Sequence, residues 1–347
     1  MYIILIYLLW EKTIKLKKFL LVLILSTKIV YADVYTFSTD NDLIFQTDKT
    51  YTAAIFFSWM GEEYSKADKD SFTYSYTSTL KDTFNYIPFI SFKDKKLNAT
   101  IDFQEMIITP EDINESEPVY DDIAYAGTVG VHFSLYSWDE YEFDLFRVSV
   151  GAVGPVSGAE YIQKYIHRLT NSTEPKGWDN QLDNHFALNF GYTKGLKSYT
   201  YNLNHNTRLE WFNSLFADVG NYYTGFGAGT LLRFGQNMPH NFDTLTALMS
   251  VTATNQINFK DRNNKFGWAL SAGTYSNYVG YMYILEASKD AGYADVSQKA
   301  KLLTAKFGLD IYYEDLQVSL EVFPTEASYD VKGNNGWGRI NITWAFD

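Results

Sequence analysis

The stretch YAGTVGVHFSL, residues 125–135, decides the fold class of this 347-residue chain. Its odd positions are apolar, aromatic or glycine, whereas its even positions carry small or polar side chains such as Thr128, His132 and Ser134. This two-residue period is typical of a β-strand with one apolar face. The run exceeds the roughly 5–6 residues of an ordinary soluble strand and approaches the roughly 9–11 that cross a membrane at a tilt.

The same alternation recurs along the rest of the chain, with no internal repeat or proline-rich linker between runs. About twelve strands are predicted, an even number as bacterial outer-membrane barrels require. The expected strands cover residues 34–42, 51–60, 98–108, 124–137, 141–153, 183–195, 205–217, 222–235, 265–275, 300–313, 315–324 and 336–346. We therefore predict an all-β fold, a transmembrane antiparallel β-barrel forming one domain over residues 33–347.

Composition agrees with a membrane barrel. Aromatic residues make up 18% of the chain and charged residues 20%, and four tryptophans stand near strand ends as an interfacial girdle would place them: Trp59, Trp138, Trp268 and Trp344. The absence of cysteine excludes a disulfide scaffold, a thiolate metal site and a cysteine nucleophile. The net charge of −12 argues against a nucleic-acid partner, because no basic surplus is available to neutralise phosphates.

The first 32 residues are predicted to be a cleaved signal peptide. Four lysines between Lys12 and Lys18 precede an apolar run at 19–25, and Val30-Tyr31-Ala32 supplies small residues for cleavage. The run is too short to span a bilayer. Residues 1–11 precede the basic segment, so translation is expected to start further downstream. Cleavage leaves 24 basic and 40 acidic residues in an exported, strongly acidic protein.

One segment, residues 154–168, does not alternate and is predicted to contain a short helix in an extracellular loop. Ser157 and Glu160 have the spacing of a capping box, so the helix is expected to begin there. Gln163 and His167 then share one face, while Tyr161, Ile162, Tyr165 and Ile166 are expected to form the packing side. His167 is the side chain suited to act as a base at neutral pH. The alternative is a structural plug or lid.

A second polar cluster closes the first strand, at Asp40-Asn41-Asp42, and Tyr51-Thr52 opens the next. Carboxylate and amide oxygens are hard ligands that suit Ca²⁺. Aspartate and asparagine are also ordinary turn residues, and taken alone the motif favours a turn.

Taken together, the motifs resemble the outer-membrane lipid A 3'-O-deacylases of the LpxR type, over nearly the whole mature chain. The shared motifs are DND at 40–42, DKTYT at 48–52, YAG at 125–127, GPVSGAE at 154–160 with Gln163 and His167 after it, and GWDNQL at 177–182.

This resemblance implies a twelve-stranded barrel in the outer membrane of a Gram-negative bacterium, which hydrolyses the 3'-linked acyloxyacyl ester of lipid A with Ca²⁺. It implies His167 as the general base, Gln163 as a helper on the same face, Asn41 and Thr52 as further site residues, and Asp42 as a calcium ligand. The expected partners are lipid A or lipopolysaccharide as substrate and the surrounding membrane lipid, with the protein a monomer.

The chain departs from the family pattern at three places. Ala53-Ala54 follows Thr52 where the family has Asn-Gly, and Ile123-Ala124 stands where a basic residue and a proline precede Tyr125. An acidic residue expected soon after His167 is not assigned, since Thr173 and Glu174 are both close to its place.

Two other functions remain open. A phospholipase A with a serine nucleophile is suggested by His132-Phe133-Ser134, although both side chains share the lumen face of their strand. The other alternative is a passive channel or structural barrel whose helix only plugs the lumen. The sequence lacks the G-x-S-x-G elbow of serine hydrolases, because Ser157 stands one place too late in GPVSG.

Overall fold

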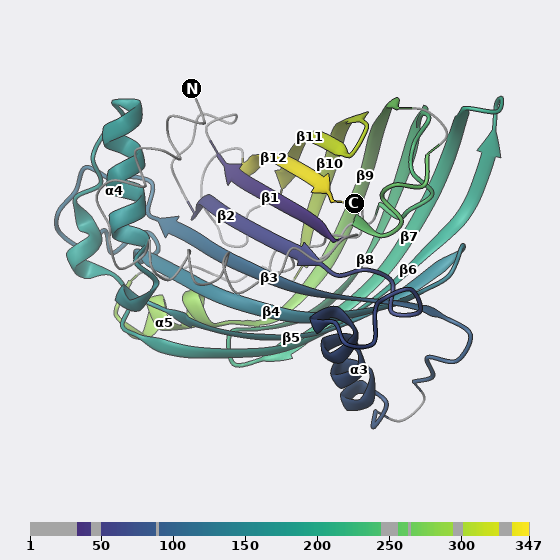
Figure 1. Ribbon diagram of the computed structural model, residues 1–347. Helices are drawn as coiled ribbons and strands as arrows, with labels where there is room; N and C mark the ends of the chain where they lie inside the picture. Colours follow the sequence, from purple (N-terminus) through teal and green to yellow (C-terminus); the bar gives the residue numbers. More distant parts are fainter. Residues whose placement is uncertain are drawn as a thin grey trace.

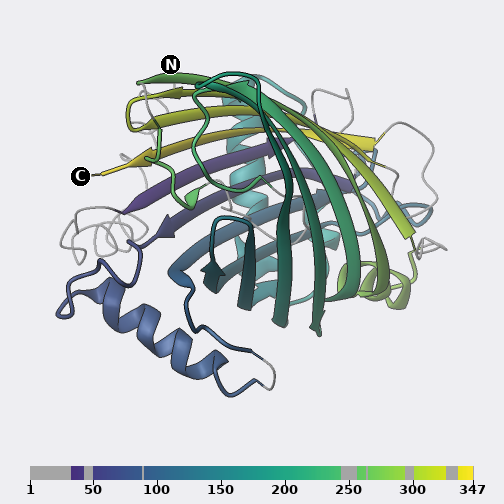
Figure 2. The same cartoon turned by 90° about the vertical axis from the view of Figure 1, so that its right-hand side faces the viewer.

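The computed structural model describes residues 33–42, 50–87, 90–243, 256–262, 265–293, 301–325 and 335–346. The predicted signal peptide lies outside this part of the chain. Twelve strands form one closed antiparallel barrel in which every strand pairs with its sequence neighbours and β1 pairs with β12 (Figures 1 and 2). The strands are β1 (Val34–Asn41), β2 (Thr50–Met60), β3 (Lys96–Thr109), β4 (Ala126–Trp138), β5 (Glu142–Val153), β6 (His185–Asn202), β7 (Thr207–Gly220), β8 (Tyr223–Gln236), β9 (Phe266–Met282), β10 (Lys301–Tyr313), β11 (Leu316–Thr325) and β12 (Asn335–Ala345).

The predicted barrel and its strand number are confirmed, but two strands are longer than expected. β6 continues to Asn202 and β9 to Met282, each seven residues beyond its predicted end. In β9, Tyr275 and Val279 point inward while Ser276 points outward, so the two faces no longer differ in polarity. The alternation that locates a strand in the sequence is therefore lost there.

Side chains divide between lipid and lumen as the alternation requires. The outward faces carry large apolar residues, among them Phe190, Phe226, Leu270, Phe307 and Leu320. Of the four tryptophans expected in a girdle, Trp59, Trp268 and Trp344 lie on outward positions near the chain termini. The prediction is wrong for Trp138, which is buried and donates its indole N–H to Asn98 at 2.7 Å.

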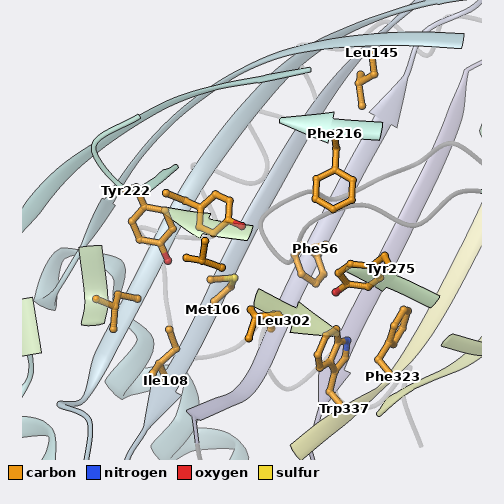
Figure 3. Close-up of a cluster of buried hydrophobic side chains, with 14 of the residues drawn as sticks. Phe56, Met106, Ile108, Leu145, Phe216, Tyr222, Tyr275, Leu302, Phe323 and Trp337 are labelled. Carbon is orange, nitrogen blue, oxygen red and sulfur yellow. The ribbon is translucent and has the colours of Figure 1, made fainter. Parts of the chain in front are cut away.

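The lumen is filled by packed and paired side chains. Figure 3 shows an apolar cluster of inward residues that includes Phe56, Met106, Tyr275 and Trp337. Buried ion pairs lie on the same inner face: Arg147–Asp218 at 2.6 Å, Arg233–Glu210 at 2.6 Å, Lys306–Glu321 at 2.7 Å and Arg339–Asp40 at 2.7 Å. Residues from the connection between β8 and β9 enter this interior, where Asp243 pairs with Lys306 at 2.8 Å.

Both ends of the barrel chain lie together, since the Phe346 N–H donates to the Asp33 carbonyl at 3.0 Å. Three of the connections at this end, residues 139–141, 203–206 and 314–315, are tight turns, as on the periplasmic side of bacterial barrels. The opposite end, which carries α4 (Ala159–Thr170), is therefore the extracellular one (Figure 1).

Two further helices were not expected from the sequence. α3 (Phe72–Phe84) begins at Ser71, whose side chain accepts from the Tyr74 N–H, and packs Phe84 against the outer wall near the termini. α5 (Tyr283–Asp290) follows β9 at the extracellular end. None of the helices in the described ranges is long and apolar enough to cross a membrane.

The pair that joins the first and last strands should dominate barrel stability. Arg339 donates two hydrogen bonds of 2.7 Å to Asp40, and Tyr51 donates a third of 2.6 Å. Arg339→Met leaves a buried carboxylate without its cation and is expected to lower the free energy of unfolding by about 3–5 kcal/mol. The double variant Asp40→Leu/Arg339→Met should lose less than the single variant. Urea unfolding in detergent, followed by tryptophan fluorescence, measures both.

Lys66→Met is the matched control, because Lys66 is exposed and forms only a surface pair with Glu63 at 3.3 Å. A change of about 0–1 kcal/mol is expected there. An Arg339→Met protein as stable as the control would contradict the role given to this pair.

Candidate active site

The extracellular helix α4 rests on the outer wall of the barrel. Its residues Ala159 and Ile162 pack with Ala53 of β2 and Ile107 of β3, which occupy outward positions of their strands. We call this contact the α4 seam; it comprises Ala53, Ile107, Tyr125, Ala159, Ile162 and Trp178. Because its wall side is the lipid-facing surface, the seam lies on the membrane side of the barrel wall and not in the lumen.

Gly127 of β4 allows the helix to approach. A Cβ at this position would lie 2.1 Å from Ser157 Oγ and 2.3 Å from Ala159 Cβ. The predicted capping box is wrong: Ser157 ends a short 3-10 turn, η2 (Pro155–Ser157), and Gly158 precedes α4 in the left-handed conformation with φ 76°. Without a Cβ, glycine adopts this conformation at little cost.

The helix turns its polar side to the wall. Ala159, Gln163 and His167 are its buried residues, whereas Tyr161 is 77% exposed and Ile166 37% exposed. The expected packing side is therefore wrong, and only Ile162 of that set joins the seam. Apolar residues on the outside suit a helix whose surroundings are lipid.

Gln163 is fixed by the indole of Trp178, whose N–H donates to Gln163 Oε1 at 2.7 Å. Trp178 belongs to the short turn η3 (Gly177–Asn180) and packs against Tyr125 with ring centroids 5.0 Å apart. The Gln163 amide nitrogen is buried and has no acceptor among the residues that the structure describes. It is a donor held in place and available to a ligand.

His167 lies one turn further along the same buried face of the helix. Its Nδ1 is 2.5 Å from the carbonyl oxygen of Thr173. A carbonyl only accepts, so Nδ1 carries a proton, and the neutral ring has its lone pair on Nε2. Asn171 makes this possible, because its left-handed conformation, with φ 55°, ends the helix and turns the chain back to Thr173.

Neither residue considered for the acidic position brings a carboxylate to the His167 ring. Thr173 reaches His167 through its backbone, and Glu174 points away into solvent, where it accepts from Arg168 at 2.5 Å. That hydrogen bond lowers the pKa of the Glu174 carboxyl.

The remaining predicted residues lie where β1 ends and β2 begins. Asn41 pairs with Ala53 of the seam, and the Asp42 N–H donates to the Thr52 carbonyl at 3.2 Å. Thr52 sits at a bulge between Tyr51 and Ala53, and its hydroxyl is 2.8 Å from that of Thr109. Bulges of this kind redirect side chains beside functional sites.

The side-chain oxygens at this end of the wall are of the type that binds calcium. Asp42 offers a buried carboxylate, and Asn41 and Thr52 add an amide and a hydroxyl. Over the described ranges, no three histidine, aspartate or glutamate side chains come together as a metal cage. A calcium ion at Asp42 would therefore take other ligands from water or from oxygen atoms of a bound lipid.

Comparison with known proteins identifies the family of this chain. A family profile described as "Outer membrane protein LpxR" matches residues 16–346. The chain belongs to the LpxR family. It is similar in structure to LpxR from Salmonella typhimurium, with a TM-score of 0.71 and 15% sequence identity, over 90% of this chain and all of that one.

Other solved barrels are more distant from this member of the LpxR family. The β domain of the Bordetella autotransporter BrkA gives a TM-score of 0.42 at 7% identity, over 91% of this chain and all of that one. The translocator domain of the Neisseria meningitidis autotransporter NalP gives 0.41 at 10% identity, over 95% of this chain and 94% of that one. No curated protein sequence matches the chain. As an LpxR-family barrel the protein resides in the outer membrane, as predicted.

The tight contact at Gly127 predicts how α4 can be displaced. Gly127→Ala places a methyl group against Ala159 and costs about 1–3 kcal/mol of overpacking, which shifts the helix from the wall. Tryptic cleavage after Lys164 or Arg168 should accelerate by about 5- to 150-fold, because cleavage follows the undocked population.

Gly130→Ala on the same strand is the matched control, since its Cβ would meet nothing closer than 3.6 Å. Equal cleavage rates in the two variants would show that α4 does not depend on the contact at Gly127.

Proposed function

We propose that the protein is an outer-membrane ester hydrolase that removes the 3'-linked acyl group of lipid A. Membership of the LpxR family supports a lipid A deacylase-type function. The observation that carries the proposal is the position of His167, a buried base on the helix that packs against the lipid-facing wall. A lipid ester can reach this seam from the membrane without entering the lumen.

In the proposed reaction, His167 Nε2 accepts a proton from water, and the hydroxide oxygen attacks the ester carbonyl carbon. The bond from that carbon to the sugar oxygen then breaks, and His167 returns the proton to the sugar oxygen. The products are a carboxylic acid and a sugar hydroxyl. The Thr173 carbonyl keeps the imidazole in the tautomer that this step requires.

The seam also offers donors for the negative charge that develops on the carbonyl oxygen. The Gln163 amide lies on the helix side, and Asn41 and Thr52 lie on the wall side. Donors of this kind stabilise an oxyanion. Calcium held by Asp42, with Asn41 or Thr52 nearby, would supply polarisation of the ester carbonyl and charge compensation for the lipid phosphates.

The serine-hydrolase alternative is weakened by the contacts of His132. This side chain lies in the lumen and bonds to Ser149 at 2.7 Å and Gln104 at 2.9 Å rather than to Ser134. The channel alternative is weakened by the packed lumen.

His167→Ala should lower the release of fatty acid from lipid A by about 10²- to 10⁴-fold, the usual effect of removing a general base. Purified barrel is incubated with lipid A and, separately, with phospholipid, and lipid masses are followed. Ser134→Ala and Glu174→Gln are the controls and should retain activity, because one side chain lies in the lumen and the other in solvent. Unchanged lipid A after incubation of the unaltered protein with calcium contradicts the proposal.

Asp42→Asn tests the calcium assignment. Loss of the carboxylate charge should raise the calcium concentration for half-maximal activity by about tenfold, equivalent to about 1.4 kcal/mol. A chelator should abolish activity in the unaltered protein, and activity that survives the chelator removes calcium from the scheme.

A further inference from the structure

Glu105 is an acidic residue on the lipid-facing side of β3. Its neighbours Gln104 and Met106 point inward, since Gln104 bonds to His132 and Met106 belongs to the lumen cluster. Glu105 therefore points outward, in the same row as Phe103 and Ile107. Charged residues on the lipid face of a barrel are destabilising, and an ionisable group at such a position marks a candidate functional site.

The outward row of β3 becomes buried toward the α4 seam. Along the outward row of β3 the exposed fraction falls from 40% at Phe103 to 6% at Glu105 and 4% at Ile107. Glu105 pairs with Val129 of β4. The next outward pair toward the extracellular end is Ile107 with Gly127, and α4 packs against this pair. Glu105 thus marks the membrane-side edge of the α4 seam.

The Glu105 carboxylate lacks the partners that other buried carboxylates in this barrel have. Its Oε1 is buried without a hydrogen-bond partner among the described residues, whereas Asp40 and Glu210 are each bound by an arginine. The buried Gln163 amide nitrogen on the helix side also lacks a described acceptor. Buried polar groups are rarely left unsatisfied, so an acceptor and a donor bordering one seam indicate the polar part of a ligand.

The chemistry of a carboxylate restricts that ligand. It accepts hydrogen bonds from hydroxyl groups and repels phosphate. Given the proposed function, on which this inference rests, a lipid A molecule can present a hydroxyl from the sugar next to the scissile ester or from a hydroxyacyl chain. We propose that Glu105 accepts a hydrogen bond from a free hydroxyl of the bound lipid and selects lipids in which that hydroxyl is neither phosphorylated nor acylated.

The test measures lipid binding in a His167→Ala background, so that no substrate is consumed. Two lipid A pairs serve as probes: one differs by phosphate or hydroxyl at the 4' position, and the other by an acyloxyacyl or a hydroxyacyl chain at the 3' position. With Glu105 present, the hydroxyl form of at least one pair should bind at least about tenfold more tightly, as expected for one hydrogen bond to a charged group. The pair that shows the preference identifies the source of the hydroxyl.

Glu105→Leu should abolish this preference, and it should raise the urea midpoint because a buried polar group without a partner is removed. Glu105→Gln keeps an acceptor but no charge, so it should weaken discrimination against phosphate more than discrimination against the acyl substituent. If Glu105→Leu does not form a heat-modifiable barrel, the isosteric Glu105→Gln comparison decides.

Equal binding of both members of each pair with Glu105 present, or a preference that persists in Glu105→Leu, overturns the inference. Fatty-acid release by the protein with His167 intact is measured in parallel. Release without lipid preference refutes the role of Glu105 alone, whereas preference without release refutes the proposed hydrolysis alone.

Discussion

The pairing of β1 with β12 closes the sheet into a barrel. In lipid, an open sheet edge leaves backbone groups without partners, so the first and last strands must pair. Asp40 points inward and is held by Arg339 of β12. The next residue, Asn41, points outward and pairs with Ala53 of the α4 seam. Asp40 thus stabilises barrel closure on the lumen face, while the adjacent Asn41 lies at the candidate site on the lipid face.

The orientation of α4 also follows from the lipid that surrounds the barrel. A surface helix of a soluble protein buries its apolar side, whereas α4 buries Gln163 and His167 and exposes Tyr161 and Ile166. Outside the wall the surroundings are lipid, so an apolar outer side costs nothing and the protected side can hold polar groups. The site is therefore a polar strip between two apolar surfaces, which suits a substrate with a polar ester between a sugar and acyl chains.

The barrel could be predicted from the sequence because apolar and polar residues alternate along a strand that has lipid on one side only. All twelve strands were found, and only segments such as the end of β9, where inward and outward residues have similar polarity, were cut short. Helical spacing placed Gln163 and His167 on one face and the resemblance gave them roles; the structure brings both to one buried face.

Other features of the site could not be found in this way. The Thr173 contact uses a backbone carbonyl, which no side-chain pattern records. Ser157 and Glu160 have capping spacing, but the left-handed Gly158 between them starts the helix later. Glu105 was missed because the sequence around it does not show that this outward glutamate is buried; only the three-dimensional structure places it at the edge of the α4 seam.

In the proposed mechanism, lipid A binds on the outer wall beneath α4 and not in the lumen. Val129 and Thr128 are adjacent in β4, but the Val129 side chain points outward beside Glu105, whereas the buried Thr128 side chain points into the lumen, level with Met106. Photocrosslinking from a benzophenone amino acid placed at each position, in the His167→Ala protein, distinguishes the two locations. We expect lipid A adducts from position 129 and none from position 128; adducts from position 128 alone would place the lipid in the lumen and refute binding on the wall.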